Sequence, residues 1–220
     1  CSVCGETSGS ALGHSWTNAD CTTPKTCANC GETTGSALGH SWEEDTDVCS
    51  VCGEPMKQLR ILFFGNSYSQ YAAYTMYDLV KKLDYDRLVI ANYVKGSTTQ
   101  SVYWDWISGN EGISTRSYQE LIKNPDGSLE EKKAEHLSAE TGLTAYDWDY
   151  IVLQSYAPES ANSISQNQKL NHVVEYVKSK ATNPNMQLVY PINWSSNRDI
   201  SMYSLGNDYR EVWKRVLDSY

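Results

Sequence analysis

The cysteines of this chain divide it into two parts that must fold by different means. All seven cysteines lie within the first 52 residues, whereas all sixteen tyrosines lie after residue 59. The cysteine-rich part is poor in aliphatic residues, so it needs metal ions or disulfides in place of a hydrophobic core. We expect a boundary near residues 54–58, which separates cysteine- and histidine-rich repeats at 1–56 from a larger domain at 59–220.

The cysteine-rich part is built from repeats. The segment CSVCGETSGSALGHSW at residues 1–16 recurs as CANCGETTGSALGHSW at residues 27–42, and a third copy begins as CSVCGEP at residue 49. Each copy carries a Cys-x2-Cys-Gly knuckle, and the first two copies add a histidine, His14 or His40. Thiolates and an imidazole at such spacings suit tetrahedral zinc. We therefore expect zinc-ribbon-like repeats that hold Zn²⁺ in a purely structural role.

The spacing leaves the ligand sets of these zinc sites open. Three sets fit: Cys21, Cys27, Cys30 and His40; Cys27, Cys30, Cys49 and Cys52; and Cys1, Cys4, His14 and Cys21. Disulfide pairing is the alternative to metal binding, because thiols in an extracellular module can oxidise.

The repeats resemble the cysteine- and histidine-rich repeats of surface proteins from gut-type Gram-positive bacteria. This resemblance covers residues 1–54 and implies an extracellular or cell-surface location. No secretory signal is visible, and the chain starts at Cys1 inside a repeat. We expect a piece of a longer protein, whose other regions would provide any attachment to the surface.

The charge of the chain argues against two classes of partner. The formal net charge is −9, and residues 1–58 carry eight acidic side chains against two basic ones. Such an acidic chain is a poor binder of nucleic acid, because phosphate backbones require lysine and arginine. No apolar run approaches the roughly 18 to 20 residues needed to span a bilayer, so we expect no membrane span.

The second part alternates apolar strands with helical patterns. We expect buried strands at 61–64, 88–91, 149–153 and 186–192, and helices at 70–83, 170–177 and 209–216. The apolar residues at helical spacing in the first of these helices are Met76, Leu79, Val80 and Leu83. A hairpin within 118–132 should turn on Asn124-Pro-Asp-Gly127. This order predicts a three-layer α/β/α domain with a mostly parallel sheet.

The turn after the first strand presents a serine in a position suited to catalysis. The run Ile-Leu-Phe-Phe at 61–64 ends at Gly65, and Ser67 follows where a helix should begin. Active sites of open α/β sheets lie at the carboxyl ends of strands, and helix N–H groups can stabilise an oxyanion there. The alternative is an ordinary strand-to-helix turn in which Ser67 or Ser69 is the helix N-cap.

Three segments together resemble the SGNH hydrolase superfamily, and in particular a bacterial branch catalogued as a domain of unknown function. They are ILFFGNSYS at 61–69, ANYVKGSTTQ at 91–100 and WDYIVLQS at 148–155. The resemblance covers residues 59–220 and implies a flavodoxin-like fold. It implies that Ser67 is the nucleophile, that the Gly96 N–H enters the oxyanion hole, and that Gln154 replaces the asparagine donor of the family.

The resemblance also implies a catalytic histidine that this chain does not display. The family carries its base in an Asp-x-x-His motif near the carboxyl end of the domain, and no such motif occurs here. We expect His136 and His172 to be ordinary surface or partly buried residues. The expected explanation is that the domain is incomplete at Tyr220, so the base lies beyond the chain and this fragment is inactive.

The function expected from these features is ester hydrolysis through an acyl-enzyme, with no cofactor for catalysis. Carbohydrate O-acyl groups are the substrate class that the resemblance to surface proteins implies. Four aromatic residues can stack on sugars or can belong to the core: Tyr68, Trp104, Trp106 and Trp194. Two alternatives stay open, namely a catalytically idle surface module that binds a glycan or a protein, and a nucleotide or flavin binder. The nucleotide or flavin alternative is the weaker one, because the loop after the first strand contains neither a P-loop nor a GxGxxG pattern.

Overall fold

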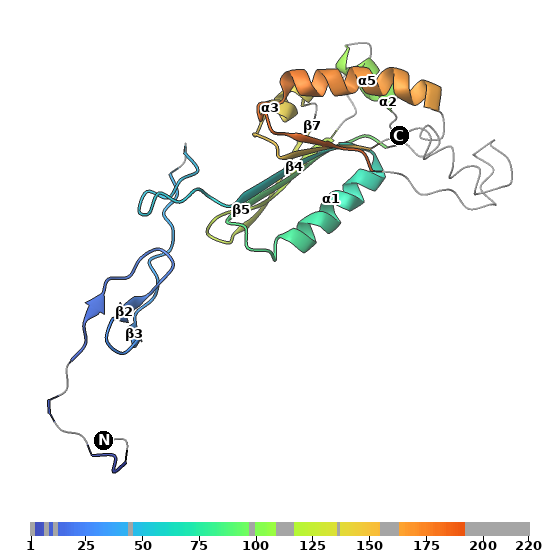
Figure 1. The fold of residues 1–220 in the computed structure, drawn as a ribbon. Coiled ribbons are helices and arrows are strands. Elements are labelled where there is room, and N and C mark those ends of the chain that lie inside the picture. Colours follow the sequence, from blue (N-terminus) through green and yellow to red (C-terminus); the bar gives the residue numbers. More distant parts are fainter. Residues whose placement is uncertain are drawn as a thin grey trace, which may run out of the picture. The chain divides into compact units, whose positions relative to one another are not determined.

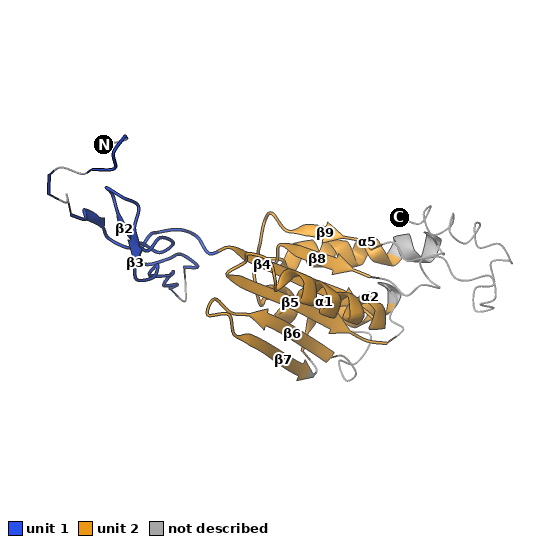
Figure 2. Ribbon diagram, turned by 90° about the horizontal axis from the view of Figure 1, so that it is seen from below, with its two compact units in different colours: residues 1–56 blue, residues 57–220 orange. Residues whose placement is uncertain are grey.

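A computed structural model describes residues 3–6, 9–10, 13–43, 46–96, 100–108, 117–135, 137–154 and 163–191. The chain forms two compact units, residues 1–56 and residues 57–220 (Figure 2). The division between Met56 and Lys57 falls within residues 54–58, where the cysteine distribution placed the expected boundary.

The first unit contains little regular structure. Its strands β1 (Trp16–Thr17), β2 (Lys25–Cys27) and β3 (Thr33–Thr34) form a small antiparallel sheet in that order. Its buried hydrophobic residues, among those described, are Cys21, Cys27, Cys49 and Met56. Three of these four side chains are thiols, so the described residues of this unit form no aliphatic core that would stabilise it.

The second unit is built on a six-stranded mixed sheet. Its strands are β4 (Gln58–Gly65), β5 (Arg87–Val94), β6 (Ser117–Lys123), β7 (Leu129–Glu135), β8 (Tyr150–Leu153) and β9 (Gln187–Val189). The order across the sheet is β7-β6-β5-β4-β8-β9. Four neighbouring strands run parallel to one another, namely β5, β4, β8 and β9. Strand β9 is shorter than the expected 186–192.

The expected hairpin is confirmed, but it changes the sheet. Strands β6 and β7 pair antiparallel with each other, and β6 pairs antiparallel with β5. Gly127 adopts a φ of 82°, which only glycine accommodates easily, and Asn124 N–H donates to the Ser128 carbonyl at 2.9 Å. The hairpin therefore forms two strands of the sheet itself, so the sheet is mixed, with four of its six strands parallel as expected and two antiparallel. A tight turn can join only antiparallel strands.

Helices lie on both faces of this sheet (Figure 1). Helix α1 (Ser67–Val80) covers one face, and the other face carries α2 (Gln100–Ile107), α3 (Ala139–Thr144) and α5 (Ser163–Lys180). A hydrophobic cluster fills each interface. The helix expected at 209–216 lies outside the described residues. Within the described ranges, no helix has both the length and the hydrophobicity that crossing a membrane would require.

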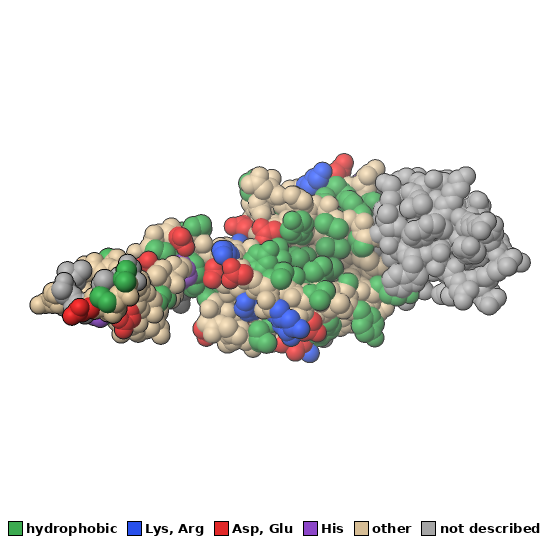
Figure 3. All heavy atoms as spheres, turned by 60° about the horizontal axis from the view of Figure 1, so that its bottom comes forward, with side chains coloured by type: hydrophobic (Ala, Val, Ile, Leu, Met, Phe, Trp, Pro, Cys, Tyr) green, Lys and Arg blue, Asp and Glu red, His purple; other side chains and the backbone are tan. Residues whose placement is uncertain are grey.

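Helix α1 forms close to the expected place, but of the four residues expected on its buried face Val80 alone is buried. Its buried residues are Ser69, Ala73, Tyr77 and Val80. Met76, Leu79 and Leu83 are exposed instead, and Figure 3 shows hydrophobic side chains gathered on this side of the second unit. The Tyr77 hydroxyl donates to the Ile122 carbonyl at 2.8 Å, which holds the tyrosine side of the helix against the sheet.

Candidate functional site

The three residues expected at the active site follow adjacent strands at the same edge of the sheet. Gly65 pairs with Val94 across β4 and β5, so Ser67 and Gly96 each follow two residues beyond that pair. Gln154 follows β8, and its N–H donates to the Phe64 carbonyl at 2.8 Å. All three therefore lie at the carboxyl ends of adjacent parallel strands, where open α/β sheets bind their ligands.

Ser67 is the first residue of α1 but does not cap it. The N-cap is Asn66, whose side chain accepts a hydrogen bond from the Tyr68 N–H at 3.1 Å. The expectation that Ser67 or Ser69 would be the cap is therefore wrong, because the asparagine amide performs that role. Ser67 is exposed, and its hydroxyl has no hydrogen-bond partner among the described residues. The first turn of α1 also leaves N–H groups without partners inside the helix.

Ser69 stabilises the turn through hydrogen bonds of its buried side chain. Its side chain is 1% exposed, and its Oγ lies 2.8 Å from the Asn66 carbonyl oxygen and 3.2 Å from Asn92 Oδ1. The two serines of the motif thus differ in chemistry, since Ser69 is buried and bonded whereas Ser67 faces solvent.

The other two expected site residues lie in different environments. Gln154 is 4% exposed, and its Oε1 accepts from the Asn66 N–H at 3.2 Å. Its oxygen therefore supports the turn before Ser67, and a donor role toward an oxyanion stays a prediction. Gly96 is exposed just after β5. The neighbouring Lys95 N–H donates to the Gly65 carbonyl at 3.3 Å, which links the two loops.

Two further residues support this edge and were not identified from the sequence. Asn92 is 2% exposed, and its Nδ2 has no hydrogen-bond partner among the described residues. The Tyr103 hydroxyl lies 2.5 Å from the Gly65 carbonyl oxygen and 3.0 Å from the Tyr93 carbonyl oxygen. An asparagine inside the apolar run LVIANYV was the available signal for the first, because strand interiors rarely bury an amide. Nothing in the sequence distinguished Tyr103 from the other tyrosines.

His172, the described histidine of the second unit, does not provide a base for Ser67. Its ring stacks on Trp104, with centroids 4.7 Å apart, and it makes no hydrogen bond to Ser67. His136 and Trp194 lie outside the described residues. Trp106 is buried in the core, Trp104 packs against it, and Tyr68 is exposed beside Ser67. Of the four aromatic residues considered for stacking, Tyr68 is thus the exposed one among those described.

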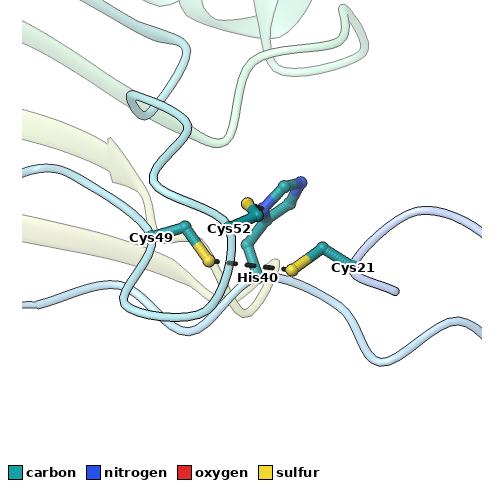
Figure 4. A group of neighbouring side chains, drawn as sticks. All are labelled: Cys21, His40, Cys49 and Cys52. Atoms are coloured by element: carbon teal, nitrogen blue, oxygen red, sulfur yellow. Dashed lines mark hydrogen bonds between the residues drawn. The ribbon is translucent and has the colours of Figure 1, made fainter. Parts of the chain in front are cut away.

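Cysteines and histidines of the first unit gather into two groups that could hold a metal ion. The larger group contains Cys21, His40, Cys49 and Cys52, whose ligand atoms all lie within 4.8 Å of one another (Figure 4). Cys21 Sγ lies 3.8 Å from Cys49 Sγ, and Cys52 Sγ lies 3.4 Å from His40 Nδ1. We call this group the second centre.

The smaller group contains His14, Cys27 and Cys30, and we call it the first centre. Cys30 Sγ lies 3.5 Å from His14 Nδ1. Neither centre matches any of the three ligand sets expected from the spacing, because each histidine approaches the knuckle of the following repeat. Cys4 is exposed and belongs to neither group, and Cys1 lies outside the described residues.

The thiols of the second centre do not ionise alike. Burial raises the pKa of Cys21 to about 12, and the neighbouring thiols Cys52 and Cys49 contribute to that rise. Burial also disfavours the Cys49 thiolate, but hydrogen bonds from the backbone of Cys52 and Val51, with further contributions from Ser41 and His40, outweigh this effect and lower the pKa of Cys49 to about 5. Neighbouring thiolates repel one another unless a cation lies between them. The described cysteines are all unpaired by disulfides.

Comparison with known proteins identifies a family for the second unit. Residues 60–219 match the family described as a domain of unknown function, DUF4886. No curated protein matches the chain at a significant level. The structure is similar to the crystal structure of a DUF4886 family protein from Bacteroides uniformis ATCC 8492 at 1.50 Å resolution, with a TM-score of 0.56 and 18% sequence identity. That likeness covers 74% of this chain and 61% of the crystallised chain, and it concerns the fold alone. Through its second unit, the chain belongs to the DUF4886 family.

Proposed function

We propose that residues 57–220 belong to a serine hydrolase of the SGNH kind that cleaves esters through Ser67, and that residues 1–56 bind structural zinc. The observation that carries the hydrolase proposal is that the polar residues at the start of α1 have different roles. Asn66 caps the helix and Ser69 is buried, so the exposed Ser67 hydroxyl, at the carboxyl end of a central parallel strand, has no hydrogen-bond partner in the described part of the chain.

The proposed reaction uses the loops at this edge of the sheet. Ser67 Oγ attacks the ester carbonyl carbon while a base takes its proton, and the N–H groups of Ser67 and Gly96 donate to the oxyanion. The alcohol leaves, and water then hydrolyses the acyl-serine to the free acid. We assign the base to a histidine outside the described residues, because His172, the described histidine of the second unit, stacks on Trp104 and makes no hydrogen bond to Ser67. For a protein with repeats of the bacterial surface type, we propose carbohydrate O-acyl esters as the substrate class and the cell surface as the location.

The test compares Ser67→Ala with the unchanged natural full-length protein on p-nitrophenyl acetate and on acetylated sugars. Loss of a serine nucleophile should reduce kcat/KM by at least about 10³-fold. Ser108→Ala is the matched control, since Ser108 is also an exposed serine and lies at the end of α2. Equal rates for Ser67→Ala and the unchanged protein would refute the nucleophile assignment. Such equality would favour the alternative of a binding module without catalysis.

The zinc proposal rests on distances in the second centre. Tetrahedral bonds of about 2.3 Å to sulfur and about 2.0 Å to nitrogen place two sulfurs about 3.8 Å apart and a sulfur and a nitrogen about 3.5 Å apart. The corresponding separations are 3.8 Å for Cys21 and Cys49 and 3.4 Å for Cys52 and His40. A disulfide would require sulfurs about 2.05 Å apart. The four side chains of the second centre would fill all four coordination positions of a tetrahedral zinc ion, as in structural zinc sites.

Metal analysis of the protein prepared under reducing conditions tests this proposal. We expect at least a full equivalent of zinc that resists dialysis, together with thiols that react slowly until a chelator is added. The matched comparison is the same protein after oxidation, which should release its zinc. Less than one equivalent of zinc per chain would contradict the proposal.

A further inference from the structure

The second centre and the first centre are built in the same way. Each combines the histidine of one repeat with the Cys-x2-Cys knuckle of the next: His14 with Cys27 and Cys30, and His40 with Cys49 and Cys52. In both centres Nδ1 of the histidine faces the second cysteine of the knuckle, at 3.5 Å in the first and 3.4 Å in the second.

Backbone pairing explains why the histidine meets the following knuckle. The residues after each histidine form an antiparallel pair with that knuckle, as Trp16 pairs with Cys27 and Trp42 bridges to Cys49. Equivalent hydrogen bonds close both pairs, from Ala28 N–H to Ser15 at 2.7 Å and from Ser50 N–H to the Ser41 carbonyl at 2.8 Å. The sequence repeat thus produces a structural repeat, but its boundaries are shifted relative to those of the sequence.

The repeated motif around each histidine also orients its ring. The ring stacks on the tryptophan two residues later, with centroids 5.0 Å apart for His14 and 4.8 Å apart for His40. The other ring nitrogen faces the glutamate that follows the knuckle glycine. His14 Nε2 lies 3.4 Å from a Glu32 carboxylate oxygen, and His40 Nε2 lies 4.0 Å from one of Glu54. A carboxylate behind a histidine fixes the tautomer whose free nitrogen binds the metal.

The loop of the first centre supplies a ligand to the second. Cys21 lies in the chain segment between His14 and Cys27, yet its thiol faces Cys49 at 3.8 Å. The segment is held there by the following repeat, because the Gly39 N–H donates to the Cys21 carbonyl at 3.0 Å and the Leu38 N–H donates to the Asp20 carbonyl at 2.8 Å. The two centres therefore share one connecting loop.

We infer that the repeats form an interlocked metal array, in which every centre joins two consecutive repeats and the loop of one centre provides a ligand to the next. The inference rests on the proposed zinc binding and goes beyond it, because it assigns the ligands. The first centre holds its ion through His14, Cys27 and Cys30, and the second through Cys21, His40, Cys49 and Cys52. Among the described cysteines, Cys4 takes part in neither.

Cys4→Ser and Cys52→Ser form a matched pair that tests this assignment, because each removes the second, exposed cysteine of a knuckle. The readout is the number of zinc ions bound to the intact chain, measured by native mass spectrometry after zinc loading. We expect the unchanged chain and Cys4→Ser to bind one ion for each centre, and Cys52→Ser to lose one of them. The ion retained by Cys52→Ser shows that the variant still folds around the first centre.

The opposite pattern would overturn the inference. If Cys4→Ser loses an ion and Cys52→Ser keeps both, the sites are built within repeats, and zinc binding itself would still stand. If the unchanged chain binds no zinc, the proposed zinc binding fails instead.

The shared loop gives a second readout. Cys30→Ser should remove the ion of the first centre and, by freeing the Cys21 loop, should accelerate chelator-driven release from the second centre several-fold. Cys4→Ser should leave that rate unchanged. Equal release rates in Cys30→Ser and the unchanged chain would contradict the interlock.

Discussion

A Cβ atom at position 65 would lie 2.3 Å from Ser69 Oγ, 2.5 Å from Ser69 Cβ and 2.8 Å from Gln154 Oε1. Gly65 does not have a positive φ, so the requirement for glycine comes from space and not from backbone conformation. The strand end, the buried serine of α1 and the residue after β8 approach one another too closely for a side chain. A single missing methyl group thus lets the turn before Ser67 form.

Gly65→Ala should therefore destabilise the second unit by about 1 to 3 kcal/mol, the usual cost of overpacking. Gly96→Ala is the matched control, because a Cβ at position 96 would meet no atom within 4 Å among the described residues. Its effect should stay within about 0.5 kcal/mol. Urea unfolding followed by far-ultraviolet circular dichroism measures both changes. Identical midpoints for the two variants would show that the turn relaxes freely around the added methyl group.

At the scale of elements, α1 depends on its cap as well as on packing. Asn66 accepts from the Tyr68 N–H through its side chain and accepts from the Gln70 N–H at 3.2 Å through its carbonyl. Its own N–H donates to Gln154 Oε1. The cap therefore connects the start of α1 to the end of β8.

Asn66→Ala should lower the free energy of unfolding by about 1 kcal/mol, because it removes the side-chain acceptor from the first turn. Asn66→Asp should retain most of that stability, since a carboxylate also accepts at an N-cap and interacts favourably with the helix dipole. Thermal or urea unfolding of the two variants provides the measurement. A loss in Asn66→Asp as large as that in Asn66→Ala would mean that packing of the amide, and not capping, stabilises this turn.

At the scale of the whole molecule, the two units are stabilised by different physics. Both hydrophobic clusters of the second unit consist of residues after Lys57. The first unit buries mainly thiols. Its stability should therefore depend on metal binding, as in other small domains in which the free energy of metal binding supplies the free energy of folding.

Chelation under reducing conditions should unfold the first unit and leave the second intact. Hydrogen exchange followed by mass spectrometry reports on each segment separately. Amide exchange should accelerate across residues 13–56 after a chelator is added, while the strands β4, β5 and β8 keep their protection. Adding zinc back should restore slow exchange. Unchanged exchange in residues 13–56 would indicate that these repeats do not need a metal to fold.

Several features followed from local sequence patterns alone. Apolar runs predicted the parallel strands, and the Asn124–Gly127 turn predicted the hairpin, because each depends on neighbouring residues. The alternation did not show that the hairpin joins the sheet beside β5, which depends on contacts between distant segments. For the same reason, the apolar spacing in α1 suggested Met76 and Leu79 as its inner face, whereas packing on the sheet selected Ala73 and Tyr77.

The sequence by itself determined that the chain divides into two units, that one of them repeats cysteines and histidines at spacings that suit a metal ion, and that Ser67 follows a buried strand. Only the tertiary structure decided that Asn66, and not Ser67, caps α1, and that His14 and His40 each meet the knuckle of the next repeat. A sequence repeat gives the residue types of a metal site, but the ligand sets depend on how the backbone pairs. That pairing joins Ser15 to Ala28 and Ser41 to Ser50, across the boundaries of the sequence repeat.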